Sequence, residues 1–305
     1  MAEVRAGQPR AIGRAISLIE NRSAAVPALA SALAADRGRA HVIGLTGAPG
    51  VGKSTTTSAM VSALRAAGER VAVLAVDPTS PFSGGALLGD RVRMQSHAVD
   101  PGVYIRSMAT RGHLGGLSVA APQALRVLDA AGFDTVLLET VGVGQSEIEV
   151  AGQADTTLVL LAPGMGDGVQ VAKAGILEIG DIFVVNKSDR DGAQAVVREL
   201  RNMVALGERP AGAWRPPIVS TVAHEGRGIT ELLDQISKFT EAQQASGAWT
   251  ERRLTRARHE IERLAVATLH AELALDGAVL DGLVRAVSCG ETDPYSAAEQ
   301  LVRAR

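Results

Sequence analysis

The chain has 305 residues, 46% hydrophobic and 21% charged, enough apolar material for one large folded domain with extensions or for two small domains. A formal net charge of −2 and an aromatic content of 3% give no electrostatic or stacking basis for nucleic acid as a partner. The single cysteine, Cys289, excludes an internal disulfide framework, and no apolar stretch reaches the roughly 20 residues that span a bilayer. We expect a cytoplasmic protein with no secretory signal and no membrane partner; a short organelle-targeting segment stays open.

Strands and helices alternate along the chain after residue 40, which predicts an α/β fold with a mostly parallel sheet and helices on both faces. Several of the expected strands are continuous runs of Val, Ile and Leu, as in strands that are covered on both faces. The expected strands are Val42–Leu45, Arg70–Val76, Val103–Arg106, Thr135–Glu139, Thr156–Leu161, Ile182–Val185 and Pro217–Ser220. The expected helices between them include Ser54–Ala67, Asp191–Leu206 and Thr230–Ala245. Ligands of such folds bind at the carboxyl ends of the strands.

Helical segments flank this core on both sides. Residues 10–37 predict a pair of short helices that is broken near Pro27. Residues 251–275 predict a longer amphipathic helix, and about 277–305 predicts one or two short helices around Pro294. We therefore expect an N-terminal helical extension over 1–40, a central α/β domain over 41–246 and a C-terminal helical arm over 247–305.

The longer C-terminal helix is crowded with arginine, and three interpretations stay open for it. It either packs on its own domain, serves as a dimerisation arm or binds nucleic acid. The last is the weakest, because the whole chain is not basic.

The most specific motif is G-x-x-x-x-G-K-S, the Walker A phosphate-binding loop, which lies between an expected strand and an expected helix. Its residues are Gly47, Ala48, Pro49, Gly50, Val51, Gly52, Lys53 and Ser54, and Thr55 follows. Its glycines let backbone N–H groups cradle phosphate oxygens, and the helix N-terminus adds partial positive charge. We expect Lys53 to reach the β- and γ-phosphates and the Ser54 hydroxyl to ligate Mg²⁺.

A second motif, N-K-x-D, directly follows the expected strand Ile182–Val185 and predicts guanine as the base. The Asp189 carboxylate can accept from both N1–H and the 2-amino group of guanine, whereas adenine offers neither donor there. Asn186 would tie the base loop to the phosphate loop, and the Lys187 stem would cover one face of the base. A weaker second base contact is expected from Ser220, Thr221 and Val222.

Acidic residues at other strand ends predict the magnesium and hydrolysis site. Glu139 stands in the acidic place of a switch sequence, where a carboxylate holds Mg²⁺ directly or through water. Asp77 is the second candidate for the magnesium shell or for positioning water, and Asp90 is the third and weaker one. With Ser54, these complete the expected metal ligands, and Lys53, Asp77 and Glu139 are the expected catalytic residues.

The switch sequence also bears on the rate of hydrolysis. The Gly142 N–H is expected to meet the γ-phosphate and to register its loss. Ras-like enzymes place a water-orienting Gln directly after this glycine, but here Val143 stands there and Gln145 comes two residues later. We therefore predict slow intrinsic GTP hydrolysis that a partner accelerates.

Five segments together resemble those of the MeaB/ArgK/MMAA GTPases, which belong to the G3E branch of P-loop GTPases. They are Gly47–Thr55, Val76–Ser80, Arg111–Ser118, Glu139–Glu147 and Asn186–Asp189. The string E-T-V-G-V-G-Q-S-E is specific to this resemblance, whereas Walker A alone is not. The resemblance extends over roughly residues 10–275.

This resemblance implies a homodimeric GTP-binding chaperone that escorts adenosylcobalamin-dependent methylmalonyl-CoA mutase. GTP binding and hydrolysis would gate cofactor delivery and protect the mutase, with GTP or GDP and Mg²⁺ as the bound cofactors. Gly164 to Lys173 matches a third switch of the family, in which Lys173 is the first residue to test. The flanking helices match the family's N-terminal extension and dimerisation arm.

Three other functions stay open. A nickel or cobalt metallochaperone GTPase would need ligands with metal spacing, but the chain has six scattered histidines and one cysteine. A kinase that transfers the γ-phosphoryl group is compatible with Walker A. A module that binds nucleotide without hydrolysis is disfavoured, because Lys53, Ser54 and the acidic candidates are all present.

Overall fold

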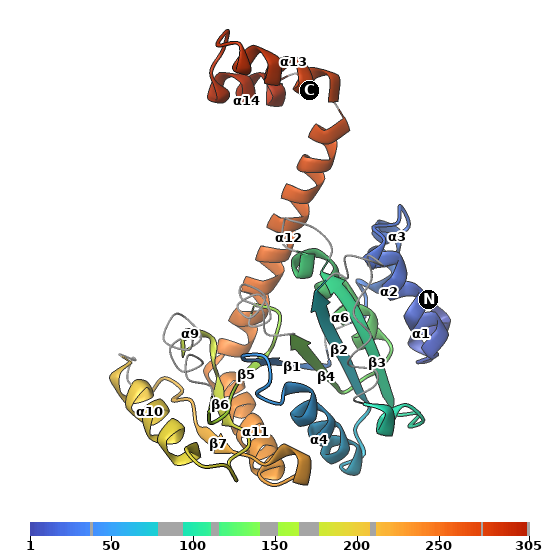
Figure 1. Cartoon of the computed structure of the whole chain (residues 1–305). Helices are drawn as coiled ribbons and strands as arrows, with labels where there is room; N and C mark the ends of the chain where they lie inside the picture. The colour runs from blue at the N-terminus through green and yellow to red at the C-terminus, as the bar shows by residue number, and fades with distance from the viewer. Residues whose placement is uncertain are drawn as a thin grey trace. The chain divides into compact units, whose positions relative to one another are not determined.

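The computed structural model of the chain describes residues 1–36, 39–78, 94–110, 116–140, 152–164, 177–207, 212–275 and 277–303. Its centre is a seven-stranded sheet with the strand order β3-β2-β4-β1-β5-β6-β7, in which every pairing is parallel (Figure 1). The strands are β1 (His41–Thr46), β2 (Val71–Pro78), β3 (Val103–Thr110), β4 (Thr135–Thr140), β5 (Thr156–Leu161), β6 (Ile182–Val185) and β7 (Ile218–Ser220). The predicted α/β class and all seven predicted strands are confirmed, and most strands extend a residue or more beyond the predicted ends.

Helices occupy most of the connections between the strands. In the N-terminal half they are α1 (Ala2–Arg5), α2 (Pro9–Glu20), α3 (Val26–Leu33), α4 (Lys53–Ala66), the 3₁₀ turn η1 (Gln95–His97) and α6 (Gly116–Ala130). In the C-terminal half they are α9 (Leu177–Ile179), α10 (Ala193–Leu206), the 3₁₀ turn η3 (Ala223–Glu225), α11 (Ile229–Ser246), α12 (Ala248–Leu275), α13 (Gly277–Ser288) and α14 (Pro294–Arg303).

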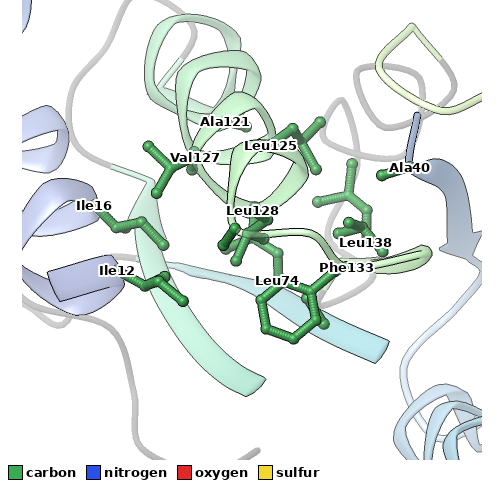
Figure 2. Packing of buried hydrophobic residues seen from close by; sticks show 14 of the residues in the cluster. Ile12, Ile16, Ala40, Leu74, Ala121, Leu125, Val127, Leu128, Phe133 and Leu138 are labelled. Atoms are coloured by element: carbon green, nitrogen blue, oxygen red, sulfur yellow. The ribbon is translucent and has the colours of Figure 1, made fainter. Parts of the chain in front are cut away.

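Alternate side chains of each strand feed two different hydrophobic layers. Leu138 of β4 belongs to a cluster that includes residues of α2 and α6, whereas Leu137 belongs to a cluster with residues of α4 and α11. Figure 2 shows the first cluster, in which Ile12 and Ile16 of α2 lie close to the side chains that α6 contributes. A smaller cluster connects β5 and β6 with α10. Each face of the sheet is thus covered, which explains why the strands are apolar on both sides.

The N-terminal helices are integral to this packing. Ile12 and Ile16 are fully buried in the cluster under α6. The predicted break near Pro27 lies slightly earlier, because α2 ends at Glu20 and α3 begins at Val26. Pro27 occupies the first turn of α3, where the missing N–H costs nothing, so this proline begins a helix.

Arginines at the start of α12 bind carboxylates at the amino edge of the sheet. Arg252 Nη1 lies 2.7 Å from Asp181 Oδ2, and Arg253 Nη2 lies 3.0 Å from Asp155 Oδ2. Arg256 pairs with the same Asp155, whose side chain is only 1% exposed. These contacts support packing on its own domain as the interpretation for this part of the helix.

The chain divides into two compact units, Met1–Arg256 and Ala257–Arg305. In the second unit, α12 exposes apolar side chains such as Ile261 and Val266. The α13–α14 hairpin, where one or two short helices were expected around Pro294, lines an apolar groove of about 470 Å³. The three-part division at residues 40 and 246 stays a prediction, as does the dimer.

Candidate nucleotide-binding site

Two glycines of the Walker loop occupy positions that a side chain could not. Gly47 has φ +140°, and a Cβ there would lie 2.3 Å from the Leu160 carbonyl oxygen of β5. Gly52 has φ +98°, and its Cβ would lie 2.4 Å from Asn186 Nδ2. The left-handed backbone and these close approaches both require glycine. The loop therefore connects the end of β1 to the start of α4 and packs closely against the carboxyl ends of β5 and β6.

Lys53 is the first residue of α4 and is buried at 7% relative exposure. Its Nζ donates to the carbonyl oxygens of Gly47 at 2.6 Å and Ala48 at 3.1 Å. The ammonium group thus lies against the concave loop and the N-terminus of a helix, where positive charge favours anions.

Glu139 and Ser54 meet at the carboxyl edge, although 85 residues separate them. The Ser54 hydroxyl donates to Glu139 Oε1 at 2.6 Å, and the Thr57 hydroxyl donates to Oε2 at 3.0 Å. Glu139 is buried at 4% relative exposure. A carboxylate oxygen and a hydroxyl oxygen are ligands that Mg²⁺ prefers, so the chemistry of this pair fits the ion. Sequence reasoning missed Thr57, which follows Ser54 by three residues on one helix face.

The N-K-x-D segment is bonded directly to the phosphate loop. Asn186 is buried, and its Nδ2 donates to the Val51 carbonyl at 2.9 Å. Its Oδ1 accepts from Thr221 Oγ1 at 3.2 Å and from the Ala223 N–H at 3.1 Å. One amide therefore joins three loops that follow β1, β6 and β7.

The neighbouring residues of the motif follow the same arrangement. Lys187 has the unusual φ of +56°, and its Nζ donates to the Gly50 carbonyl at 2.7 Å. Asp189 is exposed, and the Ser188 N–H donates to the Thr221 carbonyl at 3.0 Å. Ser220 is exposed and Val222 is buried. A carboxylate at position 189 is thus presented to solvent, two residues after the lysine that donates to the phosphate loop.

A cleft of about 720 Å³ begins at Ser54 and Thr55 and continues along α4 toward η3 and α11. Ser58 lines it on one side, and His224 and Thr230 line it on the other. Sequence reasoning missed these three residues. The serine could have been found from its helical spacing after Ser54, whereas η3 carried no recognisable signal.

Several predicted residues cannot be placed. Asp77 lies near the end of β2, opposite Ala109 of β3, but its side chain falls outside the described part. Asp90, Gly142, Val143, Gln145 and Lys173 all lie outside the described residues. Gly164, where the expected third switch begins, is described and has φ +83°.

The clearest pKa shift in the domain lies at the opposite, amino edge of the sheet. Burial lowers the pKa of His41 from 6.5 to about 4. The nearby Asp155 carboxylate acts in the opposite direction, whereas Arg253 and Arg256 act in the same direction as burial. The His41 Nε2 pairs with Thr156 Oγ1 at 2.8 Å, and Trp249 packs edge-on against the ring. Protonation of this group therefore opposes folding, and the group lies on the edge away from the nucleotide loops.

A parallel sheet with a phosphate loop after β1, a buried switch carboxylate near the end of β4 and a guanine motif after β6 defines a P-loop GTPase. The model of the family described as methylmalonyl Co-A mutase-associated GTPase MeaB matches residues 12–277. The chain belongs to this family.

Two curated relatives and one solved structure illustrate the similarity. A protein of Pyrococcus abyssi whose name classes it as a GTPase is 45% identical over 302 residues, covering 97% of this chain and 93% of the relative. The mitochondrial methylmalonic aciduria type A homolog of Mus musculus is 41% identical over 216 residues, covering 70% of this chain and 52% of that protein. The crystal structure titled LAO/AO transport system kinase has a TM-score of 0.73 at 28% identity and covers 99% of this chain and 95% of its own.

Within the residues that the structure describes, no helix is both long and apolar enough to cross a membrane.

Proposed function

We propose that this GTPase is a chaperone that gates adenosylcobalamin delivery to methylmalonyl-CoA mutase and protects that mutase. The carrying observation is the bonded unit of phosphate loop and base motif, in which Asn186 donates to Val51 and Lys187 donates to Gly50. Such a unit would contact the phosphates and the base of one nucleotide at the same time. The family description names the mutase as the associated protein, and the name of the mouse relative refers to methylmalonic aciduria.

The residue roles follow from where each group lies. Lys53 would leave its carbonyl partners to neutralise charge on the β- and γ-phosphates, and Asp189 would accept from guanine N1–H and the 2-amino group.

Ser54 and Glu139 would hold Mg²⁺, which supplies positive charge to the phosphate oxygens when it is bound. Asp77 and Asp90 remain the further expected ligands, and Asp77 is also a candidate for positioning water.

The mechanism of gating is a change in the loops that leave the carboxyl edge. The γ-phosphate holds one arrangement through contacts that hydrolysis removes. A mutase that prefers one arrangement must in return change nucleotide affinity or turnover, because the coupling is reciprocal. The exposed apolar side chains of Ala257–Arg305 are consistent with a homodimer through this unit.

Titration of the purified protein into purified methylmalonyl-CoA mutase tests the proposal. With a non-hydrolysable GTP analogue and with GDP in parallel, we expect two different affinities for the mutase, and mutase should raise the hydrolysis rate. Lys53→Ala should erase the difference between the two nucleotides. No binding with either nucleotide, or identical binding with both, would contradict the chaperone role.

A kinase function is the second candidate, because the solved relative of TM-score 0.73 carries that name. Incubation with γ-labelled GTP and a panel of amines separates the two. Label recovered only as inorganic phosphate supports the GTPase, whereas label on an amine supports the kinase. A nickel or cobalt metallochaperone stays a weaker alternative that stoichiometric nickel binding in equilibrium dialysis would support.

A further inference from the structure

Two buried hydroxyls at the carboxyl edge of the sheet lack a hydrogen-bond partner in the part of the chain that the structure describes. Thr46 ends β1 and Thr140 ends β4, with relative exposures of 0% and 1%. The Oγ1 atom of each is buried and unpartnered. A buried hydroxyl without a partner destabilises the fold, and such groups are uncommon. Valine would fill the same space without that penalty.

The two threonines are neighbours on one face of the sheet. β1 and β4 pair in parallel with Leu45 opposite Glu139, so Thr46 and Thr140 come next to each other one residue further on. Because side chains alternate along a strand, Glu139 lies on the α4 face and both threonines lie on the other face.

Apolar side chains flank this pair in the same row of the sheet. Val76 of β2 is the register partner of Thr140, and Val159 of β5 is the register partner of Thr46. Val76 belongs to the cluster under α6, and Val159 belongs to the cluster under α10. The hydroxyls therefore form a small polar spot between two hydrophobic clusters.

Two other buried threonines of the same sheet have hydrogen-bond partners for their hydroxyls. The Thr135 hydroxyl donates to Glu69 at 2.6 Å, and the Thr156 hydroxyl pairs with His41 at 2.8 Å. The unpartnered pair thus stands at the place where the phosphate loop leaves β1 and the switch sequence leaves β4. A hydroxyl that lacks a hydrogen bond at this place is explained if it gains one when a different nucleotide is bound.

We propose that Thr46 and Thr140 are positioning residues of the GTPase reaction, whose hydroxyls gain hydrogen bonds from peptide groups or water when guanosine triphosphate is bound. A bond present in one state only shifts the equilibrium toward that state by its own free energy. The pair thereby favours the triphosphate arrangement from the face opposite Glu139. This inference rests on the proposed role of the loop from Gly47 to Ser54.

Thr46→Val and Thr140→Val test the inference, because valine keeps the branched shape and removes the hydroxyl. We expect affinity for a non-hydrolysable GTP analogue to fall about five- to tenfold, the size of one lost hydrogen bond. GDP affinity should not change. The urea midpoint without nucleotide should stay constant or rise, since no bond is lost in that state. Thr140→Ser, which keeps the hydroxyl, should bind the GTP analogue with the affinity of the wild type.

Thr135→Val is the matched control, because its hydroxyl has a partner and lies at the far end of β4. It should lower the urea midpoint and leave the ratio of GTP-analogue to GDP affinity unchanged. If the Thr46 and Thr140 variants lower the midpoint in the same way, or leave that ratio at the wild-type value, the inference is wrong. A wild-type protein that binds neither nucleotide would overturn the proposed function itself.

Discussion

At the residue scale, the Walker loop shows why glycine is needed at two positions for different reasons. Gly50 has φ +80° but open space around it, whereas a Cβ at Gly52 would lie 2.4 Å from the Asn186 amide nitrogen. Gly50 therefore needs only a left-handed backbone. Gly52 also needs room for the amide that joins the base motif to the phosphate loop.

A pair of alanine variants separates these two requirements. Gly50→Ala should weaken GTP binding about tenfold, because alanine lets the free loop relax out of the left-handed region and binding must then restore it at a cost of roughly 1–2 kcal/mol. Gly52→Ala should weaken it about a hundredfold or more, because it also displaces Asn186. Calorimetric titration with GTP measures both. Equal losses would show that the contact between Gly52 and Asn186 has no role in binding.

At the element scale, the start of α12 is held by a buried charge cluster. Asp155 accepts from Arg253 and Arg256, and its carboxylate also accepts from the Val42 N–H of β1 at 3.0 Å. Burial opposes ionisation, but Arg256 and Arg253 keep the pKa of Asp155 below its ordinary value. The helix is therefore tied to the same strands whose other ends carry the nucleotide loops.

Asp155→Asn should destabilise the domain by about 3–5 kcal/mol, because it leaves two partly buried guanidinium groups without their carboxylate. Urea unfolding monitored by circular dichroism measures this. Asp36→Asn is the control, since the side chain of its partner Arg5 is 44% exposed and the change should be small. If both variants unfold at the same urea concentration, the cluster does not hold the helix.

The sequence predicted the strands better than it predicted these contacts. Val, Ile and Leu runs are local signals, and the expected bond from Asn186 to the phosphate loop followed from the motif and is present. The bridge from Arg253 to Asp155 joins residues 98 apart, so composition alone left three interpretations of the arginine-rich helix open. The cleft beside η3 was missed for the same reason, since only the folded chain forms it, whereas Thr57 could have been predicted from its spacing of three residues after Ser54 on one helix.

At the scale of the whole molecule, the carboxyl and amino edges of the sheet have different roles. The carboxyl edge carries the nucleotide loops, and the amino edge carries His41 and the arginine cluster. The folded pKa of His41 is about 4, below its ordinary 6.5, so between these values the unfolded chain binds more protons. Stability is therefore full above about pH 6.5 and falls as pH drops toward 4.

The pH dependence of unfolding tests this division. Between pH 7 and 5 the wild-type free energy of unfolding should fall by an amount on the order of 2 kcal/mol. His41→Gln, which keeps a polar group beside Thr156, should flatten that slope. GTP affinity measured at pH 7 should be equal in the two proteins. A slope that is unchanged in the variant would assign the pH dependence to other groups.

The central claim is that the Walker loop and Asp189 hold the two ends of one guanosine triphosphate. Calorimetric competition among GTP, ATP and xanthosine triphosphate tests it on the wild type and on Asp189→Asn. The wild type should prefer GTP strongly over ATP. The variant should lose affinity for GTP and gain affinity for xanthosine triphosphate, because an asparagine amide N–H can donate to the 2-oxo group of xanthine. Equal binding of ATP and GTP by the wild type, or an unchanged preference for GTP in the variant, would contradict the account.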